Sequence, residues 1–373
     1  MKIYDLDHAA TTKLDTSVYE KMKPYLEASY GNPSSMHPIG IKAKKAINDA
    51  KKGIANFLKC DYKELVFTGS GTEAINLAIK GLAFKHPEKK EIITTKIEHK
   101  ATLNACKFLE SLGYKVTYLE VDEHGFIDVN HLKSVISKET LLVSIIWGNN
   151  EIGVIQKLDE ISQIVKQTEA FLHVDAVQML GHFPIELNSL NVDLMSFSAH
   201  KIFGPKGIGL LYKKHTVTIE PLIHGGGQEF NLRAGTENVS GIIGFYEAIK
   251  NVYENYHFKQ TELELKTKHL KVMIENVVNC HLNGPEIGQD RLPGLLSLGF
   301  PNVLGHELQF ALSKEDIMVS TGSACNQSII ELSHVIKAIT TKTDGVIRLS
   351  IGYDLTFEDI KHIAETIETI ING

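Results

Sequence analysis

Short apolar segments alternate with amphipathic segments between about residues 63 and 212. The apolar segments have the length of β-strands, and the segments between them place apolar residues at the three- and four-residue spacing of a helix face. We predict strands over 64–68, 91–95, 115–119, 141–147, 171–175 and 192–197. We predict helices over 72–85, 99–112 and 158–168. This alternation is typical of a mostly parallel sheet that is covered by helices.

The pattern changes after Tyr212. A glycine-rich, charged loop over 224–236 precedes a long helical region over 239–279, which is interrupted near 256–258. The remainder predicts a smaller α/β unit, with strands near 294–299, 317–320 and 346–351 and helices near 306–312, 329–339 and 357–371. The first dozen residues are too isolated to fold alone, so we expect them to pack beside that unit. The predicted domains are therefore a large one over 13–256 and a small one that joins 1–12 with 257–373.

Length and charge narrow the classes of protein that fit. A chain of 373 residues is long enough for two domains with sizeable cores. The formal net charge of −6 argues against a surface for nucleic acid or anionic lipid. The sequence lacks an N-terminal apolar run of signal-peptide length, and it lacks the roughly 18 uninterrupted apolar residues of a membrane span. We therefore expect a cytoplasmic protein with no membrane partner and no direct nucleic-acid partner.

The four cysteines, Cys60, Cys106, Cys280 and Cys325, lie far apart and form no CxxC pair. That pattern suits a reducing cytosol better than a disulfide framework or a zinc site, so we expect no metal site. Cys325 differs from the others because small and polar residues surround it in a loop between a predicted strand and helix. Small neighbours leave a thiol exposed, whereas an inert cysteine is usually buried. Cys325 is the candidate nucleophile, although an isolated loop cysteine is more often incidental.

Two polar residues each follow an apolar strand. Asp175 ends one predicted strand, and Lys201 closes the run Ser198-Ala199-His200-Lys201 after another. Ligands of a parallel, helix-covered sheet gather at the carboxyl ends of its strands. A pyridoxal phosphate enzyme needs a lysine there for a Schiff base with the coenzyme aldehyde, and a carboxylate that keeps the pyridine nitrogen protonated. A loop lysine is far more often solvated and inert. The hypothesis therefore depends on whether other residues that could bind the coenzyme occur at the ends of neighbouring strands.

The segment Gly69-Ser70-Gly71-Thr72-Glu73 joins a predicted strand to a predicted helix. Glycines let the backbone approach an anion, and a helix start offers N–H groups and a positive dipole end, so Gly71 and Thr72 are candidates to hold the coenzyme phosphate. A glycine-bearing turn with Thr72 as the helix N-cap is an equally good interpretation. The segment also fits a loose GxGxxA dinucleotide pattern, but the next strand ends in Thr94-Thr95 instead of an acidic residue.

Four further side chains could complete such a site. His99 follows a predicted strand, where an imidazole could stack on the pyridine ring and move protons, unless it is only a cap or surface residue. Gln178, three residues beyond Asp175, can donate to the ring oxygen of the coenzyme. Ser198 and His200 flank the lysine and can hold phosphate oxygens.

Two more polar side chains could bind a substrate. Asn150, in the turn after the predicted strand ending at Trp147, is a candidate amide donor to a carboxylate or the ring, unless it only forms the turn. Arg348 lies inside an otherwise apolar strand, where a charge needs a partner. A substrate α-carboxylate gripped in bidentate fashion would supply that partner, and a structural salt bridge is the alternative.

Nearly the whole chain resembles the cysteine desulfurases of the NifS/IscS-like group, within the class V aminotransferase-like, fold-type I pyridoxal phosphate enzymes. Ten segments carry the resemblance in order: Asp7-His8-Ala9-Ala10-Thr11-Thr12, Gly31-Asn32-Pro33-Ser34-Ser35, Thr72-Glu73, Glu98-His99-Lys100, Asn149-Asn150-Glu151-Ile152-Gly153, His173-Val174-Asp175-Ala176-Val177-Gln178, Ser198-Ala199-His200-Lys201, His224-Gly225-Gly226-Gly227, Arg233-Ala234-Gly235-Thr236 and Gly322-Ser323-Ala324-Cys325. The resemblance implies an α/β fold-type I transferase, with a large coenzyme-binding domain and a smaller C-terminal α/β domain that carries the cysteine loop.

The resemblance also implies how pyridoxal 5'-phosphate would be held. Lys201 would carry the coenzyme and later shuttle protons. Asp175 would hold the pyridinium and Gln178 the phenolic oxygen, while His99 would stack on the ring and assist as acid or base. The phosphate would be bound by a set of small and polar residues that includes one from the second subunit of a homodimer. This set is Thr72, Ser198, His200 and, from the second subunit, Thr236, and it stands beside Gly71, the candidate that the loop itself suggests.

The same resemblance implies the reaction. Asn150 and Arg348 would bind the carboxylate of L-cysteine. Cys325 would attack the substrate sulfur, take it as a persulfide and release L-alanine, which suits a soft thiolate nucleophile. A sulfur-acceptor protein would then receive the sulfur, for iron–sulfur cluster assembly or for tRNA or cofactor thiolation.

Three positions depart from the family pattern. His8 stands where relatives usually have a smaller polar or an aromatic residue, and Gly352-Tyr353 replaces a common Gly-Arg, which removes a charge near Arg348. The chain stops at Gly373, straight after its last predicted helix, whereas members that supply the iron–sulfur scaffold carry a longer tail. We therefore expect a dedicated donor, for tRNA thiolation or another acceptor.

Two other hypotheses stay open on the sequence. The chain could be a class V aminotransferase or a lyase of the same fold with Cys325 incidental, and a selenocysteine lyase is a close variant. It could also be a non-catalytic scaffold that binds a sulfur carrier, which would be colourless and free of coenzyme.

Overall fold

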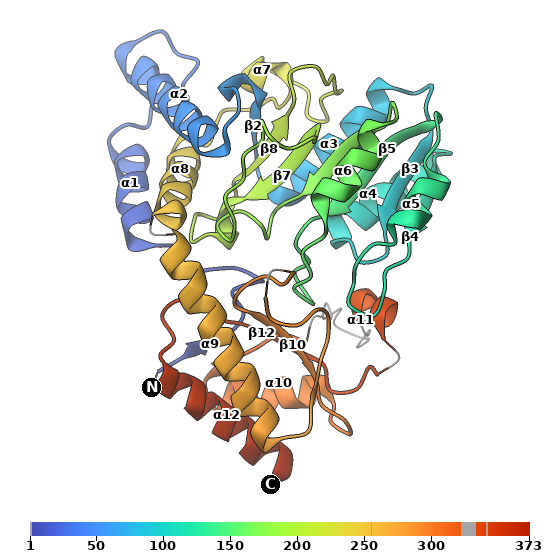
Figure 1. Cartoon of the computed structure of the whole chain (residues 1–373). Helices are drawn as coiled ribbons and strands as arrows, with labels where there is room; N and C mark the ends of the chain where they lie inside the picture. Colours follow the sequence, from blue (N-terminus) through green and yellow to red (C-terminus); the bar gives the residue numbers. More distant parts are fainter. Residues whose placement is uncertain (1, 255, 289, 322–332, 341) are drawn as a thin grey trace.

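A seven-stranded sheet forms the centre of the larger lobe (Figure 1). The computed structural model describes residues 2–254, 256–288, 290–321, 333–340 and 342–373. The sheet has the order β2-β8-β7-β6-β5-β3-β4 and consists of β2 (Leu65–Thr68), β3 (Glu91–Thr95), β4 (Lys115–Leu119), β5 (Thr140–Ile146), β6 (Phe171–Asp175), β7 (Leu194–Ser198) and β8 (Gly209–Lys213). Within the described ranges, β8 alone runs in the direction opposite to the other six strands. The predicted mostly parallel sheet is confirmed.

Helices cover both faces of this sheet because its strands are apolar on both sides. On β5, Leu142 packs into the cluster under one set of helices and Val143 into the cluster under the other, as the two-residue repeat of a strand requires. One face is covered by α3 (Gly71–Lys85) and α4 (Lys100–Ser111). The other is covered by α1 (Thr16–Glu27), α2 (Pro38–Leu58), α5 (Val129–Val135), α6 (Leu158–Lys166) and α8 (Val239–Tyr253).

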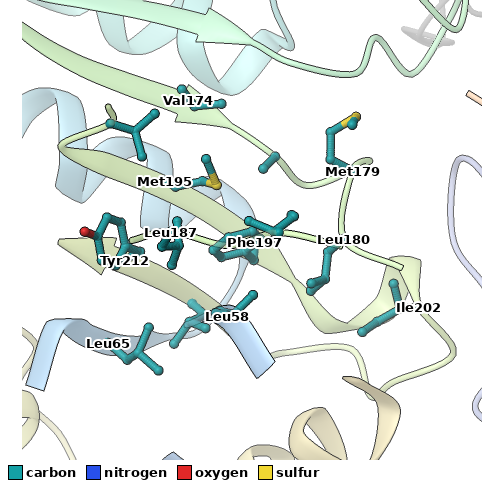
Figure 2. Close-up of a cluster of buried hydrophobic side chains, with 14 of the residues drawn as sticks. Leu58, Leu65, Val174, Met179, Leu180, Leu187, Met195, Phe197, Ile202 and Tyr212 are labelled. Atoms are coloured by element: carbon teal, nitrogen blue, oxygen red, sulfur yellow. The ribbon is translucent and has the colours of Figure 1, made fainter. Parts of the chain in front are cut away.

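The apolar core lies directly beneath β6 and β7. Figure 2 shows Val174 of β6 beside Met195 and Phe197 of β7, all of them fully buried. Each such side chain contributes about 1.5–3 kcal/mol when it leaves water, so this cluster holds the two strands firmly in place. The last residue of β6 is Asp175, and β7 leads into the short 3₁₀ turn Ala199–Lys201. The core therefore fixes the backbone that carries both candidate coenzyme residues.

The smaller lobe contains two short sheets (Figure 1). One is antiparallel, with the order β12-β10-β9: β9 (His281–Leu282), β10 (Leu295–Gly299) and β12 (Ile347–Ser350). The other pairs β1 (Tyr4–Asp5) in parallel with β11 (Ile317–Met318), so the start of the chain adds a strand to this lobe. Its helices are α9 (Tyr256–Val277), α10 (Gly305–Lys314), α11 (His334–Ile339) and α12 (Phe357–Asn372). The domain boundaries at 12/13 and 256/257 stay a prediction.

Most predicted elements occur within a few residues of their expected ends. The break in the helical region is real, because α8 ends at Tyr253 and α9 begins at Tyr256. The described part of the helix predicted over 329–339 is α11, and residues 329–332 lie outside the described residues. Helices α1, α2 and α5 were not predicted; α1 contains Pro24, which obscures a helical pattern. In the described part of the chain, no helix is both long and apolar enough to cross a membrane.

Candidate active site

A cavity of about 360 Å³ opens where β5, β6 and β7 end. The last residues of these strands, Ile146, Asp175 and Ser198, all line it. Its wall includes all the predicted coenzyme and substrate residues except Thr236: Gly71, Thr72, His99, Asn150, Asp175, Gln178, Ser198, His200, Lys201 and Arg348. Thr236 is exposed and does not line this cavity, and Cys325 lies outside the described residues.

The amine of Lys201 is held by the start of the chain. Its Nζ donates to the carbonyl oxygens of Ala9 at 2.6 Å and Ala10 at 2.7 Å. Burial and the nearby Arg348 guanidinium lower the pKa of Lys201 to about 8. The Ala9 carbonyl also accepts from the side-chain amide of Gln178 at 2.9 Å. An amine with this pKa is partly neutral near physiological pH, as a nucleophile that attacks an aldehyde must be.

Asp175 is a buried carboxylate at the end of β6. Its Oδ1 accepts from the N–H of Val177 at 3.0 Å, and none of the ion pairs in the described part of the chain includes it. Burial raises the pKa of Asp175 to about 6, against a smaller opposite effect of Lys201. A buried carboxylate in this state gains a partner when a cationic ring N–H arrives, which suits the pyridine nitrogen of the coenzyme.

His99 is both a helix cap and a cavity residue. It is the N-cap of α4, and its Nδ1 accepts from the N–H of Ala101 at 3.1 Å. Burial, followed by the charges of Lys201 and its neighbours, lowers the pKa of His99 to about 4. The two interpretations of this residue are thus compatible. The neutral, flat ring is suited to stacking on an aromatic coenzyme.

Glu98 is a buried acid that sequence reasoning missed. Its Oε1 accepts from the N–H of Ile146 and the hydroxyl of Thr95, both at 2.8 Å. Its Oε2 is buried and has no hydrogen-bond partner among the described residues. Burial raises the pKa of Glu98 to about 8, so the acid is mostly protonated at neutral pH. Glu98 connects β3 to β5 directly beside His99. Its place next to His99 in the sequence was the one feature that could have marked it as part of the site.

The N-terminus of α3 forms a narrow cup. Ser70 is the N-cap and accepts from the N–H of Glu73 at 3.1 Å, so the alternative with Thr72 as cap is wrong. A Cβ on Gly71 would lie 3.0 Å from Cγ2 of Val177 and 3.3 Å from Cβ of Ser198. This residue must therefore be small for the cup to keep its shape.

One hydroxyl in this cup fits an arriving phosphate. Ser198 Oγ is buried and has no hydrogen-bond partner among the described residues, which is costly unless a ligand completes it. His200 lines the same wall, with its Nδ1 3.2 Å from the hydroxyl of Thr11. An amine, a buried carboxylate and an anion cup thus share one cavity, and these residues fit pyridoxal phosphate.

Arg348 joins the smaller lobe to the cavity. Its Nη1 donates to the carbonyl oxygen of Asn150 at 2.9 Å, and its Nη2 lies 2.7 Å from Oδ1 of Asp7. Its Nε is buried and has no partner among the described residues. The salt-bridge interpretation is therefore correct in part, and an unused donor remains for a carboxylate. The neighbouring Asn149, and not the side chain of Asn150, stabilises the turn that follows β5. Its side-chain amide donates to the carbonyl of Ile97, and its Oδ1 accepts from the N–H of Glu151.

The described residues on either side of the range 322–332, in which Cys325 falls, contact residues at or next to the cavity wall. Before it, the backbone N–H of Ser320 donates to the carbonyl of Arg348 at 3.1 Å. After it, the hydroxyl of Ser333 donates to the Glu151 carboxylate, and Nε2 of His334 lies 2.9 Å from the carbonyl oxygen of Glu98. These contacts place both described flanks near the cavity, because Arg348 lines it and Glu98 and Glu151 each adjoin a lining residue in the sequence.

The other cysteines are poor nucleophiles. Burial raises the pKa of Cys60 and of Cys106 to about 12, and that of Cys280 to about 11. The thiolate is the reactive form, so these three thiols are largely inert at neutral pH.

Known proteins resemble this chain over nearly its whole length. Cysteine desulfurase IscS of Dictyoglomus turgidum is 45% identical over 371 residues, which cover 98% of this chain and 94% of that protein. A solved NifS-like protein superposes with a TM-score of 0.93 at 39% identity and covers 100% of both chains. SspA in complex with cysteine superposes with a TM-score of 0.82 at 36% identity, covering 94% of this chain and 99% of that one.

These relatives confirm the predicted fold-type I architecture and the predicted dependence on pyridoxal phosphate. The profile of the aminotransferase class-V family matches residues 3–363 of the chain. The protein therefore belongs to the class V aminotransferase family.

Proposed function

We propose that the protein is a pyridoxal phosphate-dependent cysteine desulfurase, which converts L-cysteine to L-alanine and takes the sulfur on Cys325. The observation that carries the proposal is one cavity that brings together Lys201, Asp175 and Arg348. Relatives named cysteine desulfurase at 40–45% identity support it. Purified protein with coenzyme should release one alanine for each sulfur removed from L-cysteine, and a preparation that releases none would overturn the proposal.

The chain's own residues hold the coenzyme. Lys201 would bond to its aldehyde carbon and Asp175 would pair with its ring nitrogen, while His99 would lie against the ring. The α3 cup, with Ser198 and His200, would bind the phosphate. When bound, the coenzyme withdraws electrons from the substrate Cα and so makes a proton there acidic.

The substrate is oriented by its carboxylate. Arg348 offers its unused Nε beside the Asn150 turn, which sets the amino acid with its Cα toward Lys201. The Lys201 amine then takes the Cα proton and later returns protons to the product. The thiolate of Cys325 attacks the substrate sulfur: a sulfur–sulfur bond forms, the Cβ–sulfur bond breaks, and cysteine plus enzyme thiol become alanine plus enzyme persulfide.

Replacing Arg348 with glutamine should raise the KM for L-cysteine by about ten- to a hundredfold, because a charge-assisted hydrogen bond to the carboxylate is lost. The coenzyme should still bind, since Arg348 does not contact the proposed ring or phosphate groups. Steady-state alanine release at several L-cysteine concentrations measures KM and kcat. Cysteamine, which lacks the carboxylate, is the control: it cannot yield alanine, so the sulfur removed is measured instead, and wild type and variant should remove it at the same rate. An unchanged KM for cysteine would contradict the role.

We also propose that two copies of the chain form the active unit. Apolar side chains are exposed together along one stretch before and at the start of α2: Leu26, Tyr30, Met36, Ile39 and Ile41. Thr236 is exposed on its own chain, which leaves it available to complete the phosphate site of a second copy. The molar mass in solution, measured by light scattering, tests this; a coenzyme-loaded monomer with full activity would overturn it.

The acceptor of the sulfur is proposed to be a protein of iron–sulfur cluster assembly or of tRNA or cofactor thiolation in the cytoplasm. The name IscS among the relatives supports the first of these. Capture of partners from the native host with persulfide-loaded protein, followed by transfer of labelled sulfur, distinguishes the two.

A further inference from the structure

The turn α7 (Gln228–Asn231) has an unusual backbone. Three consecutive residues with side chains lie in the left-handed region: Glu229 at φ 45°, Phe230 at φ 58° and Asn231 at φ 65°. L-residues rarely adopt this conformation, and it persists only where the surroundings impose it. The surroundings of α7 should therefore reveal what holds the turn and what it positions.

A buried ion pair holds this turn against α2 and β2. Lys51 Nζ lies 2.7 Å from Oε2 of Glu229, and each side chain is 5% exposed. The same oxygen accepts from the N–H of Phe67 at 2.7 Å. The ammonium also lies 4.7 Å from the ring centroid of Phe230 and 5.2 Å from that of Phe67. Glu229 thus ties the left-handed turn to the strand that leads into the phosphate cup, and Lys51 contacts both Glu229 and Phe230.

The turn delivers Arg233 to that cup. Arg233 Nε donates to Oε1 of Glu73 at 2.9 Å, and its Nη2 donates to Oε2 at 3.4 Å. Glu73 Oε2 in turn accepts from the N–H of Gly69 at 2.8 Å. Gly69, Glu229 and Arg233 line one small cavity of about 40 Å³. The strained turn and the anion cup are therefore parts of one connected structure.

The carboxylate of Glu73 has opposite effects on the helix α3 and on a phosphate bound at its N-terminus. Glu73 lies in the first turn of α3, where its charge stabilises the helix end. The same charge, next to Thr72, repels an incoming phosphate. Glu237 lines the small cavity too and adds a second carboxylate. Arg233 is the guanidinium that pairs with Glu73 and offsets its charge.

We infer that Arg233 is a positioning residue for the coenzyme phosphate: it neutralises Glu73, whose carboxylate holds the Gly69 backbone, and the Lys51–Glu229 pair sets the place of Arg233. This inference rests on the proposed function in that the phosphate belongs to pyridoxal phosphate. Arg233 need not touch the ligand, because it acts through Glu73.

A double-mutant cycle tests the inference on coenzyme-free protein, with dissociation constants measured for pyridoxal phosphate and for pyridoxal, which has no phosphate. Arg233→Gln should weaken pyridoxal phosphate about tenfold or more and leave pyridoxal unchanged, as the loss of a charged hydrogen-bonding partner implies. Glu73→Gln alone should keep or improve the affinity. The double variant should regain most of the loss, because the uncompensated carboxylate is gone while an amide oxygen still accepts from Gly69.

Two results would overturn the inference. One is an Arg233→Gln protein that loses affinity for both compounds equally, which indicates general damage to the site. The other is a double variant no better than Arg233→Gln. A wild-type protein that binds neither compound would instead defeat the proposed function, so the two failures are distinguishable.

The ion pair has its own test. Lys51→Met should weaken pyridoxal phosphate selectively, and Lys51→Met/Glu229→Gln, which buries no lone charge, should show the same loss with a more stable fold. Lys52→Met, at the neighbouring exposed lysine of α2, is the matched control and should behave as wild type. Unchanged affinity in both Lys51 variants would show that the turn does not depend on the pair.

Discussion

Replacing Lys201 with alanine is expected to abolish alanine release from L-cysteine and to remove the visible absorption of lysine-bound coenzyme. The amine is the group in the cavity that can bond to the coenzyme aldehyde, and its pKa of about 8 makes it available as a base afterwards. Loss of such a group typically costs about 10²–10⁴-fold in the proton-transfer step alone. Absorption spectra and an alanine assay on the same preparation measure both effects.

The variant should still bind pyridoxal phosphate without a covalent bond, because Asp175, Ser198 and the α3 cup are intact. Lys206→Ala is a suitable control, since this lysine follows closely in the chain but is exposed and does not line the cavity. A Lys201→Ala protein that keeps the absorption band would show that another amine carries the coenzyme.

Replacing Cys325 with alanine should produce the opposite combination. The coenzyme band should persist and should still change on addition of L-cysteine, because Lys201 and Arg348 are untouched. Persulfide formation should disappear, and alanine release should fall to the rate that added thiols support. Mass spectrometry of the peptide containing Cys325, after exposure to L-cysteine, should show one added sulfur atom in the wild type and none in the variant.

Cys280→Ala is the matched control, because burial raises the pKa of that thiol to about 11. It should retain both persulfide formation and turnover. Undiminished sulfur removal by Cys325→Ala would end the nucleophile assignment and favour an aminotransferase or lyase of the same fold. A comparison of L-cysteine with selenocysteine then separates the remaining variant of the hypothesis.

Local patterns were enough to predict the coenzyme end of the cavity. Asp175 and Lys201 each follow an apolar strand, and adjacent parallel strands bring their carboxyl ends to the same edge. The position of Gly71 at a strand-to-helix junction was equally informative. The sequence around each of these residues was sufficient to predict that they lie at the same edge of the sheet. The roles of the individual side chains remain predictions.

Contacts between distant segments were not predictable in the same way. The carbonyls of Ala9 and Ala10 reach Lys201, and Asp7 reaches Arg348, across most of the chain. Neither pairing follows from periodicity or composition. The raised pKa of Glu98 was also hidden, because it results from complete burial among elements that meet only after folding. The left-handed turn was not predictable either, because none of its positive-φ residues, Glu229, Phe230 and Asn231, is a glycine.

The two carbonyls that receive the Lys201 amine have a consequence for the first residues of the chain. When the lysine nitrogen becomes bonded to the coenzyme, it can no longer give protons to both Ala9 and Ala10. Loading the cofactor would thus remove one of the contacts between the amino-terminal segment and the lysine loop, while Thr12 keeps its bonds to His200 and Phe203. The proposed bond to the cofactor would therefore free at least one carbonyl oxygen of the amino-terminal segment, far away in sequence, to accept a hydrogen bond from another donor.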